Sequence, residues 1–224
     1  MTESLADAKK TANVDPIIAW LDNLTDEIFE LFHCLELFKF TRDEVLAKNP
    51  LILKGADTTY FDWIMRSSTV DMIIRVTCLC DQRPDTESLV CFLRALGNEP
   101  YYLSRDRFIK LYVGSGVEDF ATRDFERLCG RVVTSFPVAF INSDIALLTN
   151  EEPFSKIKDH RNQWIAHLAK TKGDSGHYDD LFVATEKIEV LIKKYKLLLT
   201  GGSLLSATPT IQGNWQAVLQ TPLI

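Results

Sequence analysis

Arg161 and His167 are the two residues whose types and spacing could do chemistry together. They lie six positions apart in RNQWIAH (161–167), inside the stretch KIKDHRNQWIAHLAKTK (156–172). A histidine titrates near neutrality and can act as a base or an acid, whereas an arginine offers a permanent planar fork for two phosphate oxygens. The pair therefore suits acid–base chemistry beside a bound phosphate. This scheme requires no metal ion, and we expect neither a metal nor a cofactor.

The helix that must carry this pair is predicted to start after Asn150 and to continue to about Lys170. Glutamates and a proline follow Asn150, and these residue types suit a first helical turn. Its apolar residues recur at spacings of three and four and form one stripe: Phe154, Ile157, Trp164, Ile165 and Leu168. Arg161 falls in the middle of this stripe. A permanent cation is costly there unless it meets an anion, a cavity or another subunit.

Three further long helical segments are predicted. Asp15 caps the first, with Pro16 in its first turn, and apolar spacing predicts that it either ends near Phe40 or continues through Leu46. The second follows Asp57-Thr58 and ends near Cys80, and a closing helix covers Tyr178 to Leu199. In the second we expect these residues to face inward: Tyr60, Trp63, Ile64, Ile74 and Leu79.

Shorter elements fill the middle of the chain. We expect helices over 86–96, 104–113 and 118–136, and an irregular segment or a short turn of helix over 138–150. The fold class is therefore all-α, a bundle of four or more long helices with short inserted helices. Residues 1–14 are expected to be a flexible arm, 15–199 the helical domain, and 200–224 an uncharged tail that is disordered or docks through Trp215.

Composition limits the class of protein. The 224 residues carry 46% hydrophobic residues and a formal net charge of -6, so a packed core is expected and bulk electrostatic coating of nucleic acid is not. The five cysteines are an odd number with mostly apolar neighbours, which indicates reduced core thiols. No apolar run is long enough to cross a bilayer, and we expect a cytoplasmic protein that does not bind membranes.

The Arg-polar-x4-His pattern of RNQWIAH resembles the signature of the HEPN superfamily. Together with VDMIIRVTCLCD (70–81) and TESLVCFLRALG (86–97), it most resembles the U-type abortive-infection branch of that superfamily, found in bacterial phage defence. The resemblance covers residues 15 to 199, and the tail after Leu199 is unusual for a compact HEPN domain. It implies a HEPN-like helical bundle paired as a homodimer.

The resemblance also implies the function. Arg161 and His167 of both protomers would line one cleft and cleave RNA by attack of its 2′-hydroxyl, leaving 2′,3′-cyclic phosphate ends. Asn162 would hydrogen-bond the phosphate or orient His167, and His160 and Lys158 would bind substrate or add positive charge. The expected protein is a metal-independent endoribonuclease of toxin or antiphage type, with RNA and an antitoxin or another defence component as partners. Some HEPN toxins are modified on a tyrosine two residues after the histidine, but that position here is Ala169.

Purely structural roles are also compatible with several of these residues. His160 is also typical of an exposed helix position, and the lysines of a solvated face. Trp164 is more typical of core or dimer packing than of base stacking. Asp71 and Arg75, four apart, suit a surface ion pair or, with Asp81, a second layer behind the Arg161 helix.

Two rival functions remain open. One is a non-catalytic HEPN-like dimerisation or protein-interaction module, in which Arg161 would bind a carboxylate of the other subunit. The other is a metal hydrolase using His160, His167 and His177 with Asp179 or Asp180. His160 and His167 are about 10 Å apart along a helix, too far to share one ion without bending.

Overall fold

The computed structural model describes residues 15–48, 59–130, 133–166 and 178–208. Within these ranges the secondary structure is helical, apart from one isolated bridge between Ser104 and Ser135, so the all-α prediction is confirmed. The main bundle consists of α1 (Pro16–Phe40), α3 (Thr59–Leu79), α9 (Glu152–His160) and α10 (Tyr178–Thr200). The other elements are η1 (Thr41–Leu46), α4 (Leu89–Gly97), α5 (Pro100–Leu103), α6 (Arg105–Lys110), η2 (Glu118–Phe120), α7 (Ala121–Cys129), α8 (Val138–Asn150) and η3 (Arg161–Ala166).

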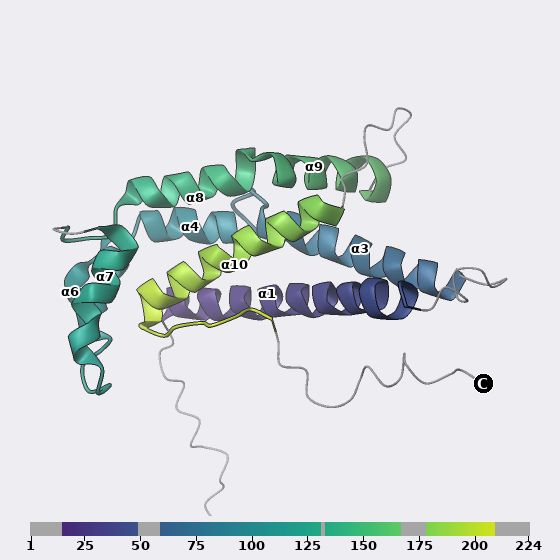
Figure 1. The fold of residues 1–224 in the computed structure, drawn as a ribbon. Helices are drawn as coiled ribbons and strands as arrows, with labels where there is room; N and C mark the ends of the chain where they lie inside the picture. Colours follow the sequence, from purple (N-terminus) through teal and green to yellow (C-terminus); the bar gives the residue numbers. More distant parts are fainter. Residues whose placement is uncertain (1–14, 49–58, 131–132, 167–177, 209–224) are drawn as a thin grey trace, which may run out of the picture.

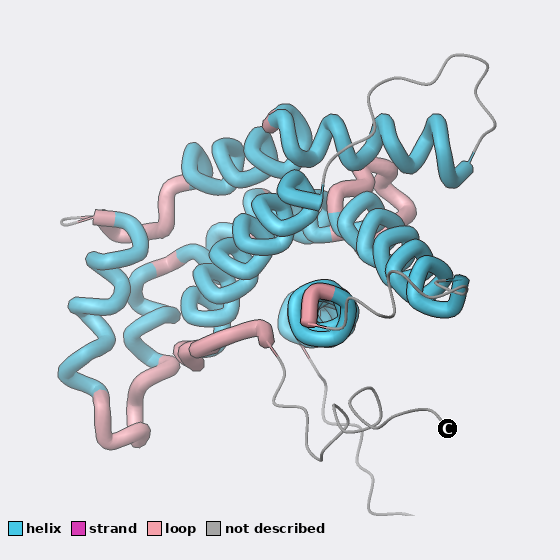
Figure 2. Tube along the Cα trace, turned by 45° about the vertical axis from the view of Figure 1, so that its right-hand side comes forward, coloured by secondary structure: helices cyan, strands magenta, loops and turns pink. Residues whose placement is uncertain are grey.

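The bundle is organised around α1 and α10, which pack against each other (Figure 1). At one end α3 and α9 complete it, and further along α4 packs on α1 and on α8. α8 and α9 follow one another along one side of the molecule, and α6 and α7 pair at the end opposite to η3 (Figure 1). Figure 2 shows that the other described loops join helix ends, whereas the segment 201–208 follows α10 and runs back along the bundle.

The first helix begins where the sequence predicts. The Asp15 side chain accepts a hydrogen bond from the Ile17 backbone N–H at 3.0 Å, and Pro16 occupies the first turn. The helical path continues without a break through η1 to Leu46, the longer of the two predicted extents. Its apolar stripe is buried, including these residues: Leu21, Leu24, Ile28, Leu31, Leu35 and Phe38.

The closing helix also agrees with the prediction, and its expected inner face is wholly buried: Leu181, Ala184, Ile188, Leu191, Ile192, Tyr195 and Leu198. The carboxylate of Asp144 on α8 accepts hydrogen bonds from the Tyr195 hydroxyl and from the Lys194 ammonium. Buried polar groups need such partners. This cluster therefore fixes α8 against α10.

The predicted inner face of α3 is wrong at three positions. Tyr60, Trp63 and Ile74 are exposed. The buried residues come from the second half of the helix: Met72, Ile73, Val76 and Leu79. Tyr60 and Trp63 lie in the first turns of α3, before the part of the helix whose residues are buried against the bundle.

The middle of the chain differs most from the prediction. The short helix α4 starts at Leu89, because Ser88 accepts the Cys91 N–H at 3.1 Å and acts as its cap. The helix expected over 118–136 ends at Cys129, since Gly130 has a φ of 87° that stops helical propagation. The segment 138–150, expected to be irregular or a short turn of helix, is instead the 13-residue helix α8. α6 has the expected Ser104 cap and is shorter than predicted, ending at Lys110.

The start of the C-terminal tail packs against α10. Glu189 accepts hydrogen bonds from the Ala207 N–H at 2.7 Å and from the Ser206 hydroxyl at 3.2 Å, and Ala207 is buried. Trp215 and the arm 1–14 lie outside the described residues. Among the described helices, none combines the length and apolarity needed to span a bilayer. The five cysteines are free thiols, four of them wholly or partly buried and Cys78 exposed.

Candidate functional site

The helix that carries the predicted pair starts one residue later than expected. Asn150 is the last residue of α8, and Glu151 takes the N-cap position of α9 with extended backbone angles (φ -73°, ψ 147°). Pro153 lies in the first turn, where its missing N–H costs nothing. Phe154 and Ile157 are buried against the bundle, so the first half of the predicted apolar stripe is confirmed.

The second half of the stripe changes register at Arg161. From Arg161 to Ala166 the backbone winds as the wider π-helix η3, whose bonds reach five residues back instead of four. Arg161 is therefore exposed and does not occupy a core position in the single chain, and Trp164 is 41% exposed. Ile165 remains packed against the core. The predicted stripe is thus wrong at Trp164, where the backbone geometry differs, and Leu168 lies outside the described residues.

Arg161 opens into a groove of about 1020 Å³ between the end of α3, the loop after it, and α9. We call this the arginine groove; its charged residues are Asp81, Arg83, Lys158, Asp159 and Arg161. Arg83 and Asp81 pair with each other at 2.8 Å. The Arg161 Nη1 donates to the Asn162 Oδ1 at 2.9 Å, and among the described residues it forms no ion pair with a carboxylate. Lys158 and Arg161 therefore present positive charge to this groove.

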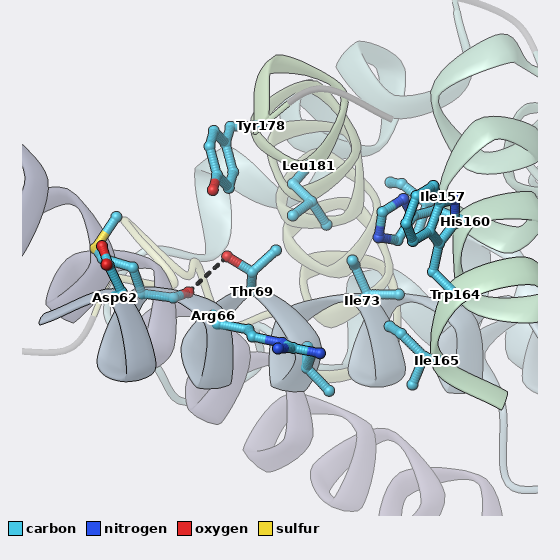
Figure 3. Close-up of a pocket in the computed structure, with 12 residues that line it drawn as sticks. Asp62, Arg66, Thr69, Ile73, Ile157, His160, Trp164, Ile165, Tyr178 and Leu181 are labelled. Carbon is cyan, nitrogen blue, oxygen red and sulfur yellow. Dashed lines mark hydrogen bonds between the residues drawn. The ribbon is translucent and has the colours of Figure 1, made fainter. Parts of the chain in front are cut away.

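His160 faces a different groove, of about 810 Å³, between α3, α9 with η3, and the start of α10 (Figure 3). We call this the histidine groove; its residues include Asp62, Arg66, Thr69, Ile73, Ile157, His160, Trp164 and Leu181. The rings of His160 and Trp164 stack with centroids 6.0 Å apart and planes 13° apart. Consecutive residues His160 and Arg161 thus serve two grooves on two sides of one helix.

Burial lowers the pKa of His160 below its usual value near 6.5. Its Nδ1 is covered and has no hydrogen-bond partner among the described residues. Burial therefore favours the neutral form of this ring over the charged form. Its geometry suits a stacking or hydrogen-bonding role.

Asp71 and Arg75 bind α1. The Arg75 Nε donates to Asp71 at 2.9 Å, its Nη1 donates to Glu27 at 2.9 Å, and the Cys34 thiol also donates to Asp71 at 2.9 Å. This pair links α3 to α1 through side chains, so its contacts agree with a structural ion pair. Asp81, in contrast, lies in the arginine groove with Arg161.

Burial also raises the pKa of the Cys80 thiol, at the wall of the arginine groove, to about 12. The nearby Lys158 ammonium opposes this shift and is the smaller effect. The thiol therefore stays protonated at neutral pH and is a poor nucleophile.

His167 and His177 lie outside the described residues, so the structure gives no geometry for the Arg161–His167 pair. Within the described ranges, no group of three His, Cys, Asp or Glu residues could hold a metal ion. The histidine groove was not predicted from sequence. Regular α-helical spacing predicted that Trp164 packs inward, so nothing in the sequence indicated a groove beside it.

Comparison of the chain with protein-family models, with curated proteins and with solved structures finds no match.

Proposed function

We propose that the protein is a metal-independent endoribonuclease of the HEPN type, active as a homodimer in prokaryotic toxin or abortive-infection defence. The proposal starts from the resemblance of the Arg161–His167 motif. The observation that supports it most is the exposed Arg161 in the arginine groove, beside Lys158 and without a carboxylate partner among the described residues. A cation held in this way is available to bind an anion.

The chemistry follows from the residue types. RNA cleavage by the 2′-hydroxyl needs a base for that proton, an acid for the leaving 5′-oxygen, and cations for the charge that develops on phosphorus. His167 takes the acid–base role. Arg161 binds the phosphate oxygens, and Lys158 adds charge to the same groove.

Asn162 has a defined part in this scheme. Its side-chain oxygen accepts the Arg161 Nη1 at 2.9 Å, which limits the directions in which the guanidinium can point. This contact favours a role in orienting Arg161, in addition to the expected hydrogen bond of Asn162 to the phosphate or its orientation of His167. Replacement by Ala would lower the cleavage rate less than loss of the arginine itself.

The test is incubation of the purified protein with total cellular RNA, in parallel with EDTA and with added Mg²⁺. Wild type is compared with Arg161→Ala and His167→Ala, and with Arg127→Ala as a matched control that removes an exposed charge from α7. We expect cleavage by wild type and Arg127→Ala, and rate losses of about 100-fold or more for the other two, the usual cost of an oxyanion ligand or an acid–base group.

The oligomeric state of each variant is measured alongside. If wild type cuts no RNA and all four proteins are dimers, the ribonuclease proposal fails and an interaction module is favoured. If cleavage by wild type stops in EDTA, the metal-hydrolase alternative is favoured instead.

A further inference from the structure

We propose that the histidine groove binds one unpaired base of single-stranded RNA, stacked on Trp164. The identity of the ligand as RNA rests on the proposed function, whereas the stacking site rests on the geometry of α3, α9 and η3. Trp164 thereby has a binding role in place of the packing role that regular helical spacing favours.

The aromatic wall is the first argument. Trp164 is 41% exposed at the groove, and its indole lies nearly parallel to the His160 ring. Unpaired RNA bases are typically held by stacking on aromatic side chains, since every base has a flat face.

The opposite wall provides polar groups suited to a nucleotide. Asp62 and Arg66 line it from α3, and Thr69 lies one turn further along (Figure 3). Arg66 is exposed, and among the described residues it forms no ion pair. A guanidinium and a flat aromatic side chain that line one groove can together bind a phosphate and a base.

The size and position of the groove also fit. Its volume of about 810 Å³ falls within the range of roughly 300–1,000 Å³ typical of small-molecule sites. Trp164 follows Arg161 by three residues in the same helical segment η3. Because the two grooves lie on two sides of this segment, an RNA strand would pass over the helix to place a phosphate at Arg161 and a base at Trp164.

The experiment measures binding and needs no cleavage. A fluorescently labelled oligouridylate and the same oligomer with abasic internal riboses are titrated, at one fixed salt concentration, into the full chain carrying His167→Ala. That background is compared with added Trp164→Leu, Trp164→Phe, and Trp63→Leu, the last removing a tryptophan that is exposed on α3 and does not line the groove.

We expect the parent chain to bind the base-bearing oligomer about tenfold more tightly than the abasic one, the effect of one stacked base. Trp164→Leu should remove this preference and leave affinity for the abasic oligomer unchanged. Trp164→Phe and Trp63→Leu should retain it.

Equal binding of the two oligomers by the parent chain, or no binding of either, would overturn the inference. So would a Trp164→Leu variant that loses affinity for both oligomers equally, because that pattern indicates packing. Base-dependent binding by a wild-type chain that cuts no RNA would support the groove while the ribonuclease proposal fails.

Discussion

The cluster formed by Asp144, Lys194 and Tyr195 yields a stability prediction of definite size. Tyr195 is fully buried, and its hydroxyl donates to the Asp144 carboxylate, which also accepts from Lys194. Asp144→Ala leaves the phenol hydroxyl in the core without an acceptor. That loss costs about 1–3 kcal/mol for a buried unsatisfied group.

The other contributions are smaller. The Lys194 side chain is 23% exposed and can turn its ammonium to water, so its lost ion pair costs about 0–1 kcal/mol. Alanine is the better helix former at a position inside α8, which returns about 0.5 kcal/mol. The expected net loss is therefore about 1–3 kcal/mol of the free energy of unfolding.

Urea unfolding followed by far-UV circular dichroism measures this loss. The neighbouring exposed Ser143→Ala on α8 serves as the matched control and should change stability by less than about 0.5 kcal/mol. A cycle with Tyr195→Phe separates the hydrogen bond from the rest. In the double variant no hydroxyl is left unpaired, so we expect a coupling free energy of about 1–2 kcal/mol. Additive losses, or an Asp144→Ala variant as stable as wild type, would refute the assigned partners.

Three further predictions concern stability. Because the pKa of His160 is lowered in the folded state, the unfolded chain binds the extra proton first, and the free energy of unfolding should fall as the pH drops below about 6.5. His160→Phe should flatten this fall in urea titrations at pH 5 to 7. An unchanged slope would contradict the burial of the ring. The pKa of Cys80 is raised to about 12 in the folded chain, so the free energy of unfolding should decline as the pH rises above the unfolded-state pKa of about 9. Cys80→Ala should reduce this alkaline decline in the same assay. An equal decline in both proteins would contradict the burial of the thiol. Phe154→Ala should lower the free energy of unfolding by about 3–5 kcal/mol, because it leaves a cavity in the core. The exposed control Ser155→Ala should lower it by less than about 0.5 kcal/mol. Similar values for both variants would show that Phe154 does not anchor α9 in the core.

Helix starts that depend on a local cap were largely predictable from sequence. Asp15 with Pro16, and Ser104, act as caps where expected. The same logic misplaced the start of α4, since Thr86 and Ser88 both have cap-forming side chains and only the bond to the Cys91 N–H decides between them. Local signals therefore predict that a helix starts, and the folded backbone fixes the residue.

Features that depend on distant contacts were not predictable. α8 contains Asn142, Ser143 and Asp144, which are poor helix formers, and it is held by bonds from α10 some 50 residues away. Propensity alone therefore favoured an irregular segment. Regular α-helical spacing likewise placed Trp164 and Arg161 in one apolar stripe, because a π-helical turn leaves no recognisable pattern in the sequence.

The most direct test of metal-independent cleavage by Arg161 and His167 uses one RNA oligomer spanning a mapped cut site, in EDTA. The same oligomer with a single 2′-deoxyribose on the 5′ side of the cut serves as its control. The account predicts that wild type converts the all-ribose oligomer to a 2′,3′-cyclic phosphate and a 5′-hydroxyl end, that the deoxy substitution blocks this cut, and that Arg161→Ala and His167→Ala abolish it. Cleavage of the deoxy oligomer at the same position, or full activity in either variant, would contradict it.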